Sequence, residues 1–223
     1  MNKILPFIRL DFYTLKPYKI SLLMLLVIAV IMTMAFQSLS LLCFYLMTCL
    51  VMVTSYPFSI GETNRLDTLY ATLPLNRKNV VLGRYALVLF MEVVVSLLAV
   101  IASFTLSIFT AMEFAALEIL FYLCIASFVF TLIVAIQYPV YFKIGYNKAK
   151  FVVYALLLIV FLSVILLSNL MPNTDLAKSG FDDLLQLFAI NQFLIYIAPV
   201  AAGHLLLALS CLLSCKIYGK RDI

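Results

Sequence analysis

The chain has 223 residues, of which 66% are hydrophobic and only 11% are charged, and its mean hydropathy is +1.17. These values lie far outside the range of soluble domains, so a soluble enzyme is excluded first. Residues 20–61 contain no charged side chain, and a water-soluble domain of this size could not fold around such a run. The composition therefore places the chain in a membrane.

The net charge of +5 does not indicate a nucleic-acid partner. The basic residues form short clusters beside apolar runs, where anionic lipid headgroups explain them better. The five cysteines lie inside apolar runs, form no CxxC pair and have no histidine at metal-ligand spacing, so we expect small buried hydrophobes and no metal site. They are Cys43, Cys49, Cys124, Cys211 and Cys215.

The first 19 residues are basic and precede the first apolar run. We expect them to be retained, because no convincing small-x-small cleavage site follows. Apolar residues recur at spacings of four, four and three, which predicts a short interfacial helix at the inner membrane surface over residues 1–19; an irregular basic tail is the alternative. The apolar positions are Ile4, Ile8, Phe12 and Leu15, and the polar ones include Lys3, Arg9, Asp11 and Lys16.

A membrane-spanning helix needs about 20 mainly apolar residues, because it must satisfy its backbone hydrogen bonds without water. Six segments qualify, once the long charge-free run is divided at the polar pair Gln37 and Ser38. The predicted spans cover residues 20–36, 39–58, 85–110, 117–142, 151–171 and 190–215. We therefore expect an all-α membrane protein, with residues 1–223 as a single transmembrane domain of six helices.

Lysine and arginine set the orientation, since positively charged loops stay in the cytoplasm. Four of them precede the first span, four separate spans two and three, three separate spans four and five, and three follow span six; Lys178 alone lies on the other side. That other side also holds most of the acidic loop residues. Both termini are therefore predicted to be cytoplasmic.

The cytoplasmic loop over residues 61–84 contains a predicted amphipathic helix. Leu66, Leu69, Tyr70 and Leu73 fall at i, i+3, i+4 and i+7 and form one apolar face, and Pro74 ends the helix. Asn76 is a candidate N-cap for a second helix that continues into the third span, so that movement of the loop would pass rigidly into the membrane. The alternative is a linker that rests on lipid. Charged groups stand at Glu62, Arg65 and Asp67.

This loop resembles the hallmark loop of small type-2 ABC transporter permeases. In that family an acidic residue precedes a short helix ending in Leu-Pro, followed by a basic pair and then Gly-Arg/Lys-Tyr at the third span. The matching residues here are Glu62, Leu73-Pro74, Arg77-Lys78 and Gly83-Arg84-Tyr85. The dense match covers about 30 residues, and the six-span layout fits the family along nearly the whole chain.

The resemblance implies a coupling helix that docks into a separate ATP-binding cassette ATPase. This chain lacks the GxxxxGK[ST] loop that would cradle phosphates, so we expect no cofactor here and ATP and Mg²⁺ in the partner. It also implies a dimer, with either an identical or a related permease. The residues it assigns to ATPase coupling are Glu62, Arg65, Leu66, Asp67, Leu69, Tyr70, Leu73, Pro74 and Arg77.

The outer loop over residues 172–191 contains another amphipathic stretch. Phe181, Leu184, Leu185 and Phe188 share one helical face. A plain interfacial anchor is one interpretation, whereas the resembling exporters carry short extracellular helices before the last span that cap the exit of the pathway. The resemblance favours a short extracellular helix.

Glu92 and His204 are the ionisable exceptions within the spans, and the cost of a charge in the bilayer centre means that neither should face lipid. Both are pathway candidates: Glu92 could face a partner helix or a wet vestibule, and His204 could equally be a satisfied structural histidine near Pro199. Gln137, Pro139 and Pro57 interrupt spans four and two, as bending points or as local geometry alone.

Export by an ABC permease is the function that the sequence favours. The nearly uncharged spans suit amphipathic peptides or hydrophobic molecules, and the resemblance extends to permeases of Gram-positive peptide exporters of the phenol-soluble modulin or bacteriocin type, in a bacterial plasma membrane. A self-contained secondary transporter is the alternative, but it should carry coupling carboxylates in repeated halves. An intramembrane enzyme is a weaker one, because Glu92 and His204 alone are too few catalytic groups.

Overall fold

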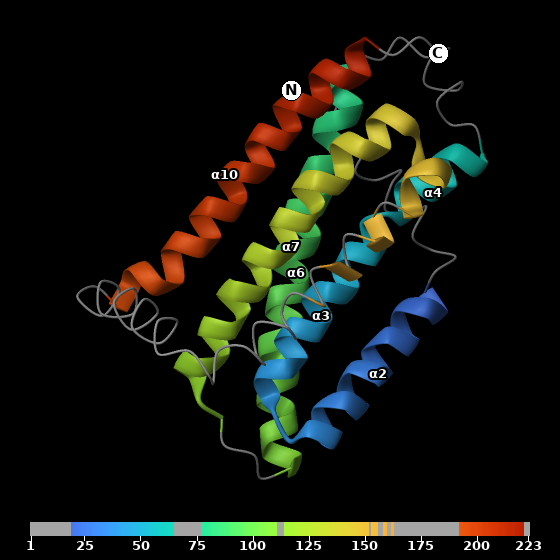
Figure 1. The fold of residues 1–223 in the computed structure, drawn as a ribbon. Helices are drawn as coiled ribbons and strands as arrows, with labels where there is room; N and C mark the ends of the chain where they lie inside the picture. The colour runs from blue at the N-terminus through green and yellow to red at the C-terminus, as the bar shows by residue number, and fades with distance from the viewer. Residues whose placement is uncertain are drawn as a thin grey trace.

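A computed structural model describes residues 19–64, 77–110, 114–151, 153–155, 158–159, 162 and 192–220 (Figure 1). Throughout these residues the chain is helical apart from short turns. The predicted interfacial helix before residue 19, most of the coupling loop, the outer loop at 172–191 and most of the fifth predicted span lie outside the described residues. The helices are α2 (Lys19–Phe36), α3 (Leu39–Val53), α4 (Tyr56–Thr63), α6 (Arg77–Thr110), α7 (Ala116–Ile144) and α10 (Gln192–Gly219).

Within the described residues, four helical segments are long and apolar enough to cross a membrane: Leu39–Thr63, Lys78–Thr110, Ala116–Ile144 and Tyr196–Gly219. They coincide with the predicted spans two, three, four and six. The first predicted span is also a helix, α2, of which Leu26–Phe36 forms a shorter apolar stretch. The all-helical fold class is confirmed for the described part of the chain, and a count of six spans stays a prediction.

The break between the first two spans falls where the sequence predicts it. Gln37 has a φ of 53°, in the left-handed region that commonly ends a helix, and its Nε2 donates to the Met34 carbonyl at 3.0 Å. The turn is therefore closed by the polar side chain that interrupts the apolar run.

The second span is not the single continuous helix predicted over residues 39–58. It bends at Thr54 and Ser55, whose hydroxyls donate to the Val51 carbonyl at 2.9 and 3.1 Å, and α4 then continues to Thr63. Pro57 lies in the first turn of α4, where its missing N–H costs no helical hydrogen bond. The bend comes from this local hydroxyl bonding together with the proline, and Glu62 becomes part of a helix instead of a loop.

Helix α6 runs without interruption for 34 residues, about 50 Å at 1.5 Å per residue. This confirms that the helix of the third span begins well before its apolar part, at Arg77. Helices α7 and α10 continue through Pro139 and Pro199, respectively, so neither proline breaks its span.

The helices pack as a bundle in which α3 and α10 each contact both α6 and α7, whereas α6 and α7 barely touch one another. Helix α2 packs on α3 at the edge of the bundle, and α10 lies on the opposite side (Figure 1). Buried apolar side chains from the four inner helices fill the centre, among them Met47, Val88, Phe130, Val134 and Leu207. Leucines and phenylalanines cover the outer faces of α2, α6 and α10, as expected for helices surrounded by lipid or partner helices.

Candidate functional site

Glu92 lies inside the bundle, near the middle of α6, and its residue is only 4% exposed. Its carboxylate Oε1 accepts a hydrogen bond from Ser127 Oγ of α7 at 2.5 Å. This bond crosses the short gap between α6 and α7, two helices that otherwise make little contact. Glu92 therefore avoids lipid, as its desolvation cost requires.

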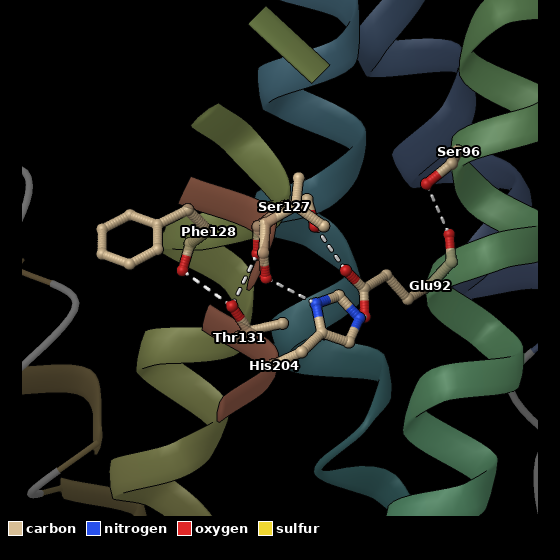
Figure 2. A network of polar contacts seen from close by, with 7 residues as sticks. Glu92, Ser96, Ser127, Phe128, Thr131 and His204 are labelled. Carbon is tan, nitrogen blue, oxygen red and sulfur yellow. Dashed lines mark hydrogen bonds and ion pairs between the residues drawn. The ribbon is translucent and has the colours of Figure 1, made fainter. Parts of the chain in front are cut away.

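His204 approaches the other carboxylate oxygen from α10. Its Nε2 lies 3.5 Å from Glu92 Oε2, and its Nδ1 lies 2.8 Å from the Val200 carbonyl oxygen one turn earlier (Figure 2). A carbonyl oxygen only accepts hydrogen bonds, so Nδ1 carries a proton and Nε2 is the nitrogen available to Glu92. The His204 side chain keeps 40% of its surface exposed, whereas the Glu92 side chain keeps 6%.

Gly203 sets how closely α10 can approach α7 beside this pair. A Cβ added at Gly203 would overlap Thr131 Oγ1 and would lie 3.3 Å from Thr131 Cβ. Small residues at such crossings let membrane helices come together without a hydrophobic driving force. The glycine next to His204 thus brings the imidazole within reach of Glu92.

The two predicted pathway candidates are therefore brought together, which sequence reasoning did not foresee, and Ser127 joins them unpredicted. Ser127 lies in a long apolar run where nothing distinguishes it from other small residues. The Gly203-His204 neighbourhood was the available signal, because a glycine before an intramembrane histidine marks a close helix crossing. In this chain Glu92 points into the bundle and contacts both Ser127 and His204. A role of these residues in a transport pathway is a proposal.

A second set of polar side chains joins α6 to α10 nearer the end of the bundle that holds the start of α6. Ser210 Oγ donates to the Ala135 carbonyl at 2.6 Å, so its oxygen is left to accept from the Tyr85 hydroxyl at 2.7 Å. Tyr85 in turn accepts from Ser214 Oγ at 2.8 Å. This ordered chain of hydroxyls fixes the Tyr85 ring where the third span enters the bundle.

The bend in the second span is held by α7. Gln137 Nε2 donates to Ser55 Oγ at 2.6 Å, and Tyr138 donates to the Thr54 carbonyl at 3.1 Å. Tyr141 adds a longer bond to Ser55 at 3.3 Å. Gln137, interpreted from the sequence as an interruption of its helix, is instead a clamp on a neighbouring one.

Glu62 ends α4 and connects it to the chain after α7. Its Oε2 accepts a hydrogen bond from the Asn147 backbone N–H at 2.8 Å, at the start of the helical segment that begins at residue 146. Gly145 turns the chain there with a φ of 87°, and a Cβ at that position would lie 3.3 Å from the Glu62 carboxylate. Glu62 thus acts as a capping group supplied from another helix.

Arg84 lies in the same region as Glu62. Its guanidinium stacks 4.0 Å from the Phe58 ring centroid and 5.6 Å from that of Phe142, and the residue is 6% exposed. A small recess, partly open to the outside, is lined by Arg84, Glu62 and neighbouring aromatic residues. Burial raises the pKa of the Tyr146 hydroxyl above its usual range, so Glu62 and Arg84 are the charged groups of this recess.

Most of the predicted coupling residues lie outside the described residues: Arg65, Leu66, Asp67, Leu69, Tyr70, Leu73 and Pro74. The segment that holds them is bracketed by α4, which contains Glu62, and by α6, which begins at Arg77. The described ranges contain no cluster of three or more His, Cys, Asp or Glu side chains that could hold a metal ion, and all five cysteines are free thiols.

These observations define a multi-pass helical membrane protein with a buried polar core. Residues 7–219 match the model of the family described as ABC-2 family transporter protein, and the chain belongs to this family. The resemblance seen in the loop is thereby confirmed at the level of the type-2 ABC permease family, whose members are the membrane components of ABC transporters and generally work with an ATPase subunit. Searches of curated proteins and of solved structures gave no match.

Proposed function

We propose that this permease exports amphipathic peptides or hydrophobic molecules across a bacterial plasma membrane, driven by a separate ATPase that docks on the loop over residues 61–84. The observation that carries the proposal is the anchoring of both ends of this loop. Glu62, at its start, is bonded to the chain after α7, and Arg84, at its end, stacks on Phe58 of α4 and near Phe142 of α7. A force on the loop would therefore reach three membrane helices together.

Packing of the spans supports an apolar cargo. The buried polar side chains Glu92, Ser127, Tyr85 and Gln137 are bonded to partners inside the bundle. Large apolar side chains cover the outward faces of α2, α6 and α10. A pathway formed between two such bundles, from two copies or from two related permeases, would present apolar surface to its cargo, with the exposed edge of His204 as a polar point on it.

The decisive experiment targets the loop. Replacing Leu69 and Tyr70 together with aspartate should remove the apolar face that the ATPase would bind, while insertion should remain normal because it depends on the spans and their flanking charges. We expect substrate-stimulated ATP hydrolysis, measured with the co-purified ATPase in nanodiscs, to fall at least tenfold. An unchanged rate in this variant would disprove ATPase docking at the loop.

A charge-matched control separates docking from a general effect of added negative charge. Lys220→Asp changes the net charge by the same two units at an exposed position just after α10, outside the loop and outside the Glu62–Asn147 contact. We expect this variant to keep its ATPase partner and its stimulated hydrolysis. Equal losses in both variants would show that the cytoplasmic charge, and not the apolar face of the loop, controls assembly.

A further inference from the structure

We propose that Glu92 and His204 together form a site that binds one proton inside the membrane domain. The proposal starts from the one orphaned oxygen of the carboxylate. Glu92 Oε1 accepts from Ser127, whereas Oε2 is buried and receives no hydrogen bond in the described structure. The nearest polar atom facing it is His204 Nε2, at 3.5 Å.

The number of protons follows from hydrogen-bond roles. Nδ1 of His204 is protonated because it faces the Val200 carbonyl at 2.8 Å, so the state of the pair depends on whether a proton lies between Nε2 and Oε2. Without that proton, two lone pairs face each other and the buried site carries one negative charge. With two protons the site carries one positive charge. With one proton, on either atom, the site is neutral and both facing atoms have a partner.

Among the described residues, the helices around the site offer no other counter-charge. Helix α3 has no charged side chain, and α7 and α10 carry theirs, Glu118, Lys143 and Lys216, in their first or last turns. On α6, Arg84 is eight residues away, about 12 Å along the helix. The polar side chains that contact the Glu92 carboxylate in the described structure are Ser127 and His204. Neutrality of this site must therefore come from the proton that the pair shares.

The geometry of the site has a consequence for helix packing. The His204 imidazole keeps 40% of its surface exposed, so the pair lies at the edge of the packed core and is not sealed inside it. Glu92 belongs to α6 and His204 to α10, with Ser127 of α7 completing the contact (Figure 2). The shared proton thus connects three helices, and its loss would leave α10 held against α6 by one contact fewer.

The single histidine of the chain makes the proton directly observable. The purified full-length chain, carrying a purification tag without histidine and labelled with ¹⁵N-histidine, gives the ring-nitrogen signals of His204 alone. We expect these signals to stay constant between about pH 6 and pH 8, the range in which an unpaired imidazole changes its charge. Glu92→Gln should restore a clear change within this range, and Glu118→Gln, at the exposed start of α7, should behave as the wild type.

The location of the proton completes the test. If the ring is protonated on both nitrogens, the shared proton lies on His204. If the ring is protonated on Nδ1 only, the shared proton lies on Glu92, and an infrared band of a protonated carboxyl should then be present in the wild type and absent in Glu92→Gln. Both results support the site. The proposed site is overturned if the wild-type ring titrates between pH 6 and pH 8, or if a neutral ring lies beside an ionised Glu92. Both outcomes are read from the wild type alone, so the test holds even if Glu92→Gln fails to fold. None of these measurements uses transport, so they are independent of the proposed export function.

Discussion

Gly203 lies where α10 meets α7, and the absence of its side chain allows His204 to reach Glu92. Gly203→Ala should force its new methyl group against Thr131 and separate the two helices. We expect a loss of about 1–3 kcal/mol, the usual cost of overpacking, measured as a lower free energy of unfolding in mixed detergent micelles. Adding Thr131→Ala should recover part of the loss because it removes the overlapping hydroxyl.

The matched control is Gly219→Ala at the end of α10. Among the described residues, nothing beyond its own turn of α10 lies within 4 Å of a Cβ at that position, so the substitution should cause no overpacking and no loss of unfolding free energy. If Gly203→Ala were equally silent, α10 would be free to move away from α7 at no cost, and the close crossing would have no role in holding His204.

Tyr85 makes a second residue-scale prediction possible, because its hydroxyl is the middle member of a chain of three. Tyr85→Phe should cost about 1 kcal/mol, since interhelical hydrogen bonds in membranes average about 0.6 kcal/mol and Tyr85 makes two of them. The measurement is the unfolding free energy of the variant, compared with that of Tyr122→Phe on the exposed face of α7. If Tyr85→Phe lowers the unfolding free energy no more than Tyr122→Phe does, Ser210 and Ser214 form equally good hydrogen bonds with other partners.

At the scale of elements, Glu62 joins α4 to the helical segment after Gly145. Glu62→Ala should lower the unfolding free energy by less than about 1 kcal/mol, because the Asn147 N–H is exposed and water can replace the carboxylate. The same variant should lower substrate-stimulated ATP hydrolysis severalfold, since the connection between the loop and α7 is lost. Glu62→Gln retains an acceptor oxygen and should keep much of the activity; a normal rate in Glu62→Ala would show that the loop acts on α6 alone.

The elements themselves could largely be predicted from the sequence, because in a membrane the helix is the one local structure that satisfies an isolated backbone. The break at Gln37, the early start of α6 and the span boundaries of α7 all follow from polar residues within apolar runs. Pro57 indicates a bending point in the second span, but the position of the break at Thr54 and Ser55 could not be predicted, since it depends on local hydroxyl bonding and on Gln137 from α7, 82 residues away.

The pairing within the site was out of reach of the sequence for a similar reason. Glu92 and His204 stand out one at a time as costly intramembrane groups, and each invites a separate explanation. Their contact is decided by how α6, α7 and α10 cross, which depends on small residues such as Gly203 that carry no charge or periodicity of their own. The partner of an intramembrane charge is a property of helix packing and not of the local pattern.

At the scale of the whole molecule, the asymmetric distribution of lysine and arginine predicts which side faces the cytoplasm. Lys148 follows α7 and is exposed, so a cysteine at that position should lie inside the cell. Asp182 belongs to the loop predicted to lie outside. In intact cells a membrane-impermeant maleimide should label Asp182→Cys and leave Lys148→Cys unlabelled, because the inner face keeps the positive charge.

This labelling requires a background without the five native thiols. Cys43 is fully buried beside Ser103, with Sγ and Oγ 3.9 Å apart, so alanine is the suitable replacement there because a bulkier residue would overpack the contact. Permeabilised cells provide the control, in which both engineered cysteines should react. Labelling of Lys148→Cys in intact cells would reverse the orientation, and the loop over residues 61–84, which shares that side of the membrane, would then be out of reach of any cytoplasmic ATPase.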